Sequence, residues 1–179
     1  MTLRERYSSA QSYDSFLEGV AINRDLWHAI SRRALVSDEI IARAEATDGR
    51  WHLLVLAEDW CGDAVNALPF IAKLAERASN LDLKILGRDS NPDLMDSHLT
   101  GGSRSIPVVI LLDETFIERA WWGPRPRDLQ EWALGAGRVL PKADRYRDMR
   151  RWYVEDRGTV VLNEIVAAVE EASRGRVAA

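Results

Sequence analysis

The apolar and polar positions in the middle of the chain alternate between strand-like and helix-like patterns. Residues 51–57, WHLLVLA, are apolar apart from one histidine, which is typical of a strand covered on both faces. Residues 62–78 follow with apolar side chains at helical spacing, and residues 81–87, LDLKILG, alternate as a second strand does. Because a helix joins these two strands, we expect them to lie parallel in one sheet.

The next segments predict the other half of that sheet. Pro92 in SNPD is favoured in the first turn of a helix, so a short helix is expected there. The segments PVVILLD and TFIERAW predict two antiparallel strands, separated by a tight turn near Asp113 and Glu114. With an amphipathic helix at about 129–136, the pattern predicts an α/β fold, a mixed sheet of about four strands flanked by helices.

Extra helices are expected at both ends of the chain. Residues 14–31 carry apolar side chains at the spacing of a helix, and Ser37 is the expected N-cap of the next helix. Residues 142–173 predict two helices broken at Gly158, with Thr159 as a cap. The last helix has a clear apolar face, which must pack on the chain's own core or on a second subunit. The C-terminal helix is therefore a candidate dimer surface, and the oligomeric state stays open.

Composition and charge narrow the class of protein. A chain of 179 residues with 46% hydrophobic and 29% charged residues fits a single globular domain over 1–179. The net charge of −4 argues against nucleic-acid binding, and the arginines within 145–151 alternate with acidic residues as on a solvated helix face. No apolar run approaches the roughly 20 residues of a membrane-spanning helix, and no signal peptide is evident. We expect a cytoplasmic protein that binds neither nucleic acid nor membrane.

The chain has one cysteine, Cys61, in the segment DWCGDA at the predicted junction of a strand and a helix. Two interpretations are open. At a helix N-terminus, unpaired N–H groups and the helix dipole favour a thiolate, which is the reactive form of a nucleophilic cysteine. Alternatively, a cysteine is simply a small residue that packs in an apolar site. A single cysteine excludes an intramolecular disulfide and fits a reducing cytoplasm.

Four segments carry a resemblance to a known family. DWCGDA resembles the Trp-Cys-Gly-Pro-Cys motif of the thioredoxin superfamily, and SRSIPVVILLD resembles its cis-proline segment, with Ile106 before Pro107. GRDSNPDL resembles the segment after the second core strand, and WWGPRP falls where the family has a glycine before its last helix. The resemblance implies a thioredoxin-like fold with its core at about 50–138 and added helices at about 14–48 and 142–173.

The departures from the family pattern affect function more than fold. Ala64 stands in place of the second motif cysteine, and Asp63 stands in place of the motif proline. Val55 occupies the position, six residues before Cys61, where thioredoxins carry a buried acid. The chain therefore lacks the internal resolving thiol and the proton-transfer carboxylate. If Cys61 attacks a disulfide, an external thiol, either a small molecule or a protein, must complete the cycle.

Charged neighbours set the expected reactivity of the thiol. Glu58, Asp59 and Asp63 are carboxylates close to Cys61 in sequence, and any that approaches the sulfur disfavours its ionisation. Arg104 would offset them if it pointed toward the thiol, although loop arginines usually point to water. We therefore expect a lowered thiol pKa, with a milder shift than a typical oxidoreductase shows.

The resemblance also implies a contact surface around the thiol. Trp60 would flank Cys61, and the backbone of Ile106 would lie beside the sulfur, where family members bind substrate main chain. Trp122 is expected to point outward and Trp121 inward, and the exposed members of the set would form an apolar patch suited to an extended peptide. The candidate substrate-binding residues are Trp60, Gly62, Asp63, Ala64, Ile106, Pro107, Trp122 and Gly123.

Two functions remain open, and with them whether the protein is an enzyme. The leading hypothesis is a monothiol disulfide oxidoreductase with Cys61 as the catalytic nucleophile, acting on a protein or small-molecule thiol or disulfide. The alternative is a redox-inactive module that binds a protein partner on the same surface. The histidines show no ligand spacing with each other or with Cys61, so we expect no metal and no other cofactor. His52, in a predicted buried strand, is expected to be a hydrogen-bonded core residue.

Overall fold

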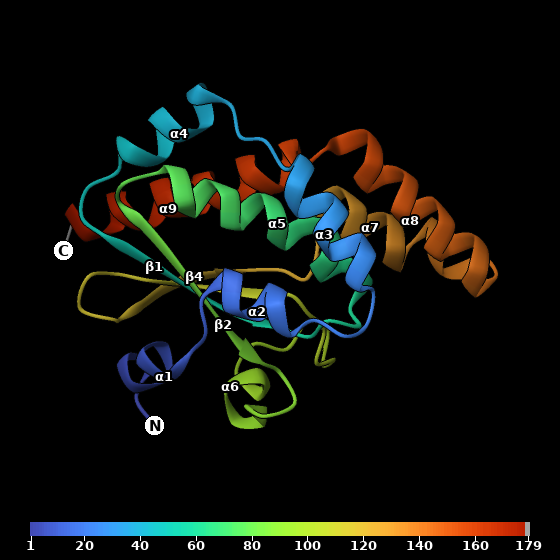
Figure 1. Ribbon diagram of the computed structural model, residues 1–179, viewed down its shortest axis with the longest axis horizontal. Coiled ribbons are helices and arrows are strands. Elements are labelled where there is room, and N and C mark those ends of the chain that lie inside the picture. The colour runs from blue at the N-terminus through green and yellow to red at the C-terminus, as the bar shows by residue number, and fades with distance from the viewer. Residues whose placement is uncertain (178–179) are drawn as a thin grey trace.

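The computed structural model describes residues 1–177, which form helices around one sheet (Figure 1). The elements in chain order are α1 (Leu3–Ser9), α2 (Tyr13–Gly19), α3 (Arg24–Arg33), α4 (Asp38–Glu45), β1 (Trp51–Ala57), α5 (Gly62–Arg77), β2 (Leu81–Gly87), α6 (Pro92–Asp96), β3 (Val108–Leu112), β4 (Glu118–Trp122), α7 (Arg127–Leu134), the 3₁₀ helix η1 (Ala136–Val139), α8 (Lys142–Asp156) and α9 (Thr159–Val177).

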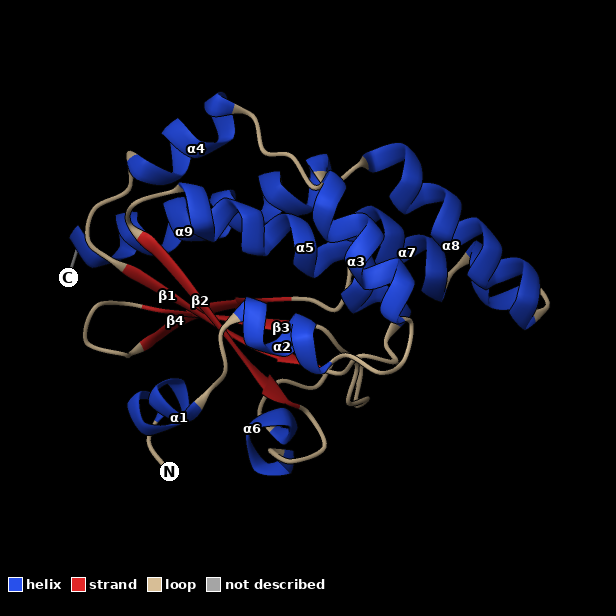
Figure 2. Cartoon of the chain, in the orientation of Figure 1, coloured by secondary structure: helices blue, strands red, loops and turns tan. Residues whose placement is uncertain are grey.

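The sheet is mixed, as the sequence pattern predicts. Its strand order is β2-β1-β3-β4, with β1 parallel to β2 and antiparallel to β3, and β3 antiparallel to β4 (Figure 2). Val55 in β1 lies opposite Ile85 in β2 and Val109 in β3, so the three strands share one apolar layer. Every residue of β1 is buried, in agreement with its nearly continuous apolar sequence.

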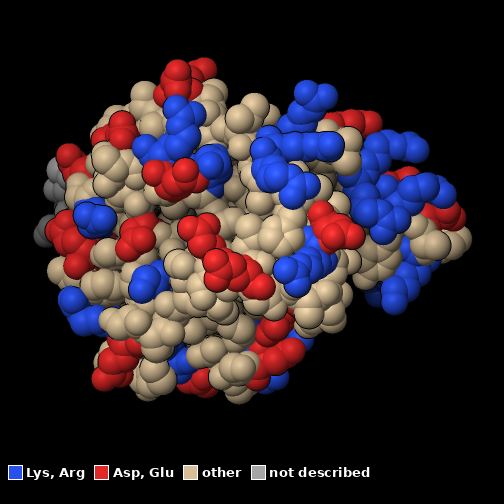
Figure 3. All heavy atoms as spheres, viewed as in Figure 1, with Lys and Arg blue, Asp and Glu red and all other residues tan. Residues whose placement is uncertain are grey.

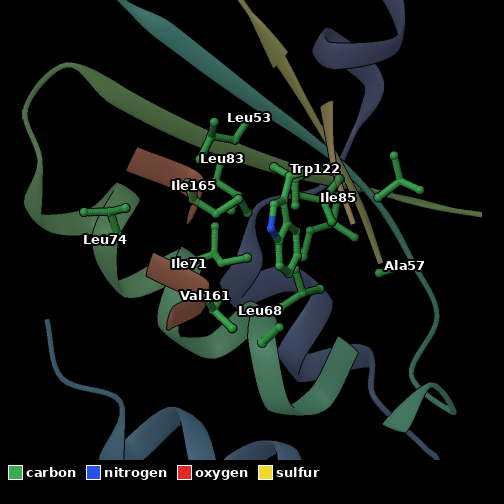
Figure 4. Close-up of a cluster of buried hydrophobic side chains, with 14 of the residues drawn as sticks. Leu53, Ala57, Leu68, Ile71, Leu74, Leu83, Ile85, Trp122, Val161 and Ile165 are labelled. Atoms are coloured by element: carbon green, nitrogen blue, oxygen red, sulfur yellow. The ribbon is translucent and has the colours of Figure 1, made fainter. Parts of the chain in front are cut away.

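Helices cover the two faces of the sheet unequally. α5 and α9 lie along one face with α3, α4, α7 and α8 beside them, whereas α1 and α6 lie on the other face (Figure 1). In the main core, Leu68 and Ile71 of α5 and Ile165 of α9 face Leu53 of β1 (Figure 4). The apolar face of the last helix is therefore covered by the chain's own core, which is the first of the two alternatives that its sequence leaves open.

Residues 14–31 form two helices with a break between them, where their spacing predicts continuous helix. The break follows from contacts with the loop that precedes Cys61. The Asp59 carboxylate accepts hydrogen bonds from the backbone N–H groups of Ala21 (2.9 Å) and Ile22 (2.8 Å), so these groups bond to that loop. The added helices thus hold the loop that carries the thiol.

The observed helix ends agree in part with those predicted from the sequence. Ser37 caps α4 as predicted, because its hydroxyl accepts the N–H of Ile40. The C-terminal break falls at Gly158, which has a φ of +80°. The cap, however, is Asp156 and not Thr159, since the Asp156 carboxylate accepts the N–H of Val160 at 2.8 Å. Helix α1 has no counterpart in the sequence prediction.

Candidate functional site

Cys61 is the N-cap residue of α5, directly after the loop that follows β1. Its sulfur accepts a hydrogen bond from the N–H of Ala64 at 3.4 Å, and its S–H donates to the carbonyl of Ile106 at 3.2 Å. Only 7% of the residue is exposed. The thiol therefore lies in the position that the motif predicts, but it is enclosed, and its proton is engaged by a main-chain oxygen.

The electrostatic environment disfavours ionisation of this thiol. Burial, and then the charge of Asp63, raises the pKa of Cys61 to about 11, although the N–H groups of Ala64 and Asp63 and the charge of Arg125 oppose the shift. The expectation of a lowered pKa is therefore wrong. The helix terminus does stabilise the thiolate, but removal of water from the sulfur outweighs it.

Asp63 is the centre of a buried polar cluster beside the thiol. Arg125 forms an ion pair with its carboxylate at 2.7 Å, and the Tyr153 hydroxyl donates a hydrogen bond to it at 3.0 Å. Burial raises the pKa of Asp63, while Arg125 and Tyr153 oppose that rise, and burial likewise raises the pKa of Tyr153. Sequence reasoning missed Arg125 and Tyr153, which lie 62 and 90 residues after Asp63.

The other charged neighbours turn away from the sulfur. The Glu58 carboxylate accepts the N–H of Asp89 at 2.9 Å, and the Asp59 carboxylate bonds to the break between α2 and α3 as described above. Arg104 forms a two-pronged ion pair with Asp96, with both N–O distances 2.7 Å, so it does not offset the acids near Cys61. Of the three nearby carboxylates, only Asp63 acts on the thiol.

The loop before β3 lies against the thiol. The Ile106–Pro107 peptide bond is cis, and both side chains are buried. Gly123, which follows β4 and has a φ of +133°, packs closely against the backbone of this loop. A Cβ atom there would lie 2.1 Å from the carbonyl oxygen of Pro107, so only glycine fits this position.

The two tryptophans of β4 have the opposite orientations to those expected. Trp122 is 8% exposed and faces the main core (Figure 4), where its indole N–H donates to Glu164 of α9 at 2.7 Å. Trp121 is 37% exposed and contacts the ring of His98 on the other face. The register explains the result, because Trp122 lies opposite Val109, and Val109 lies opposite Val55, which shares a face of the sheet with the core residue Leu53.

The expected apolar patch is consequently small. Ile106 and Trp122 are buried, as is Ala64, whose methyl group occupies the place of the second motif cysteine. Trp60 is the exposed member, with 42% of its surface accessible, and the guanidinium of Arg88 lies over its ring at 4.8 Å. Gly62 leaves open space, since nothing lies within 4 Å of the position of a Cβ.

The histidines lie apart from the thiol. His52 is buried as expected and stacks on Phe116 at 4.3 Å, and its Nδ1 lies 3.7 Å from a carboxylate oxygen of Asp82, beyond hydrogen-bond distance. His98 bonds to Leu94 and Glu118. Throughout the described chain, no group of three His, Cys, Asp or Glu side chains is placed to hold a metal ion.

None of the helices within residues 1–177 combines the length and the apolar composition needed to cross a bilayer.

Comparisons with known proteins agree with the fold. The chain is similar to a protein of unknown function from Pseudomonas aeruginosa, at 20% identity and a TM-score of 0.75, and to an HIV epitope-scaffold, at 18% identity and a TM-score of 0.74. Both matches cover 96% of this chain and 99% of the other, and at such identities they show the fold alone. No curated protein matches. A family model described as Thioredoxin matches residues 10–149, which is well over half of the chain, so the protein belongs to the thioredoxin family.

Proposed function

We propose that the protein is a thioredoxin-fold binding module whose thiol performs no disulfide exchange at neutral pH. One observation carries this conclusion: the Cys61 thiol is buried, and its S–H group donates a hydrogen bond to the Ile106 carbonyl. A thiolate at the same place would face that carbonyl oxygen without a hydrogen bond. The contact therefore favours the protonated form, which is not the nucleophile.

The magnitude of the pKa shift supports the same conclusion. The raised pKa, about 11 against an ordinary value of 9.0, lowers the thiolate fraction at neutral pH by roughly two orders of magnitude. The greater nucleophilicity of a more basic thiolate offsets only about half of that loss on a logarithmic scale. Turnover is also disfavoured because the chain has no second cysteine to release a mixed disulfide.

The surface beside the thiol supports partner binding. Trp60 presents an exposed indole with Arg88 over it, and tryptophan and arginine are the side chains that contribute most often to protein interfaces. Gly62 adds a position where a partner's backbone can approach closely. We propose that Trp60 and Gly62, with Arg88 over the indole, form the contact site for a protein partner.

A second function, monothiol disulfide exchange, has one observation in its favour. The Cys61 sulfur accepts the N–H of Ala64 at the first turn of α5, and this contact stabilises a thiolate. In that function the thiolate attacks a substrate disulfide, forms a mixed disulfide and expels one substrate thiolate. One external thiol then attacks the Cys61 sulfur of the mixed disulfide, releases the second substrate thiol and becomes disulfide-bonded to Cys61. A second external thiol attacks that new disulfide, frees Cys61 and leaves as the disulfide of the two external thiols.

Reaction with oxidised glutathione separates the two functions. The native protein is incubated with the disulfide at neutral pH, and adducts are measured by intact mass spectrometry, with the urea-unfolded protein as the control. We expect an adduct on the unfolded chain and none on the native protein over the same time. An adduct on the native protein that forms at the rate of the unfolded control contradicts the binding module and supports monothiol exchange.

A further inference from the structure

A groove runs between α3 and α8 on the face of α5 that turns away from the sheet. It has a volume of about 600 Å³. Its apolar lining comes from Leu26 and Ile30 of α3, Leu35 after α3, Phe70 of α5 and Val154 of α8. Leu35 is 80% exposed and Val154 is 69% exposed. Apolar side chains this open to water, gathered along one hollow, mark a surface that a ligand covers.

The rim of the groove carries positive charge. Arg33 of α3, Arg150 of α8 and Arg157 at the end of α8 line it, and all three are exposed. Among the described residues, no Asp or Glu lines the groove, and none of these three guanidinium groups forms an ion pair. Lys and Arg side chains gather over the α3 and α8 side of the molecule (Figure 3). An acidic protein of net charge −4 thus holds unpaired arginines around an apolar hollow.

The groove leads to the thiol site. A smaller hollow of about 100 Å³ shares Leu26, Asn66, Arg150 and Tyr153 with it and extends to Gly62 and Asp63. Tyr153 therefore contacts both the groove and the carboxylate beside Cys61. A ligand that fills the groove would end next to the surface that we propose as the partner contact.

We propose that the α3–α8 groove binds an acidic amphipathic helix of a partner protein. Its apolar side chains lie between the helices, and its carboxylates pair with Arg33, Arg150 and Arg157. Helix-in-groove recognition uses an apolar stripe of this kind, and the arginine rim selects carboxylates at its edges. The inference rests on the proposed function in that it names the partner of a binding module.

The shape of the surface favours a helix over two other ligands. A small amphiphile needs a site that encloses most of its surface, whereas Leu35 and Val154 leave this groove open. A membrane surface needs apolar side chains that project outward, whereas Ile30 and Phe70 form a recessed floor and are only partly exposed. A third helix lying between α3 and α8 covers both the floor and the rim.

Two designed peptides test the inference. Each has about 16 residues with leucines at i, i+3, i+4 and i+7, flanked by glutamates in one peptide and by lysines in the other. Binding to the full chain is measured by fluorescence anisotropy at low salt. We expect the glutamate peptide to bind at least about tenfold more tightly than the lysine peptide, with an affinity that falls as salt is added. Equal binding of both peptides, or no binding at about 1 mM, overturns the inference.

Matched variants locate the binding. The double variant Arg33→Glu with Arg150→Glu should weaken binding of the glutamate peptide about tenfold or more. Its control, Arg24→Glu with Arg151→Glu, makes the same charge change on the same helices outside the groove and should change binding less than about twofold. An apolar pair repeats the comparison, with Val154→Asp in the groove and Val139→Asp outside it. Equal effects of a groove variant and its control overturn the inference.

The remaining outcomes are also decisive. Binding to vesicles of anionic phospholipid is measured for the native protein and for the groove variants. If the native protein binds the vesicles, the groove variants do not, and neither peptide binds, the result overturns the partner helix in favour of a membrane surface. The peptide measurement involves no thiol chemistry, so a failure of the groove is distinct from a failure of the glutathione experiment.

Discussion

The S–H group of Cys61 donates a hydrogen bond to the main-chain carbonyl of Ile106, 3.2 Å away, and this bond joins the first turn of α5 to the loop before β3. Here its proton is held by the protein's own backbone, and the sulfur is covered. The hydrogen bond gives Cys61 a structural role, because it links two segments of the fold and keeps the thiol protonated.

Removal of the Asp63 charge should lower the thiol pKa. Asp63→Asn eliminates the carboxylate that, after burial, contributes most to raising the pKa of Cys61. We expect the pH dependence of thiol alkylation to move to lower pH. The variant should also lose about 3–5 kcal/mol of stability, because Arg125 loses its buried partner. Glu58→Gln is the control, and it should leave the thiol titration unchanged because Glu58 bonds to Asp89. A shift of equal size in both variants would contradict this assignment.

Gly123 should be irreplaceable for packing, in contrast to Gly62. Gly123→Ala places a methyl group 2.1 Å from the Pro107 carbonyl oxygen, at a φ of +133°, and should destabilise the fold by about 2 kcal/mol or more. Gly62→Ala lies in open space at the start of α5 and should be neutral or stabilising by up to about 1 kcal/mol. Urea denaturation of the two variants measures the difference. Similar stabilities would show that Gly123 does not require the close approach.

The two buried histidines, His52 and His98, should have pKa values on opposite sides of the ordinary value of 6.5. Burial lowers the pKa of His98, but the hydrogen bonds to Glu118 and Leu94 outweigh it, so the net pKa is raised from 6.5. Burial lowers the pKa of His52. His98 therefore contributes stability that is full below pH 6.5 and is lost as pH rises through its folded pKa. His52 contributes stability that is full above pH 6.5 and is lost as pH falls through its own folded pKa.

Imidazole resonances followed by NMR against pH measure both values. Glu118→Gln should lower the pKa of His98, because the opposing effect of burial remains, and should leave His52 unchanged. A His98 titration that stays the same in this variant would exclude Glu118 as the cause.

The cap of α9 should depend on Asp156. Asp156→Ala removes the carboxylate that accepts the N–H of Val160 and should cost about 0.5–2 kcal/mol. Thr159→Ala is the matched control and should change the free energy of unfolding by less than about 0.5 kcal/mol. Thermal unfolding of both variants provides the comparison. A larger loss in Thr159→Ala would restore the cap that the sequence predicts.

The sheet could be predicted from the sequence because the apolar pattern of each strand lies within the strand's own residues. Residues 51–57 and 81–87 show their burial pattern directly, and Pro92 marks a helix start within its own segment. Resemblance of four ordered motifs then placed Cys61 at the N-terminus of α5. These features depend on residues that are close together along the chain.

The environment of the thiol could not be predicted in the same way. The burial of Cys61 depends on packing, and the partners of Asp63 come from the loop after β4 and from α8. The alternation of Trp121 and Trp122 was predicted, but which of them faces the core depends on the register with β3. The break between α2 and α3 depends on Asp59, which no local pattern in residues 14–31 reveals.

The rate of Cys61 alkylation by iodoacetamide against pH, measured on the native protein, tests the central claim most directly. We expect slow labelling at neutral pH, a rate that rises toward a midpoint near the thiol pKa of about 11, and rapid labelling once the chain is unfolded. A midpoint at or below about 7.5 with a substantial native rate would contradict the claim and show that the helix terminus outweighs burial.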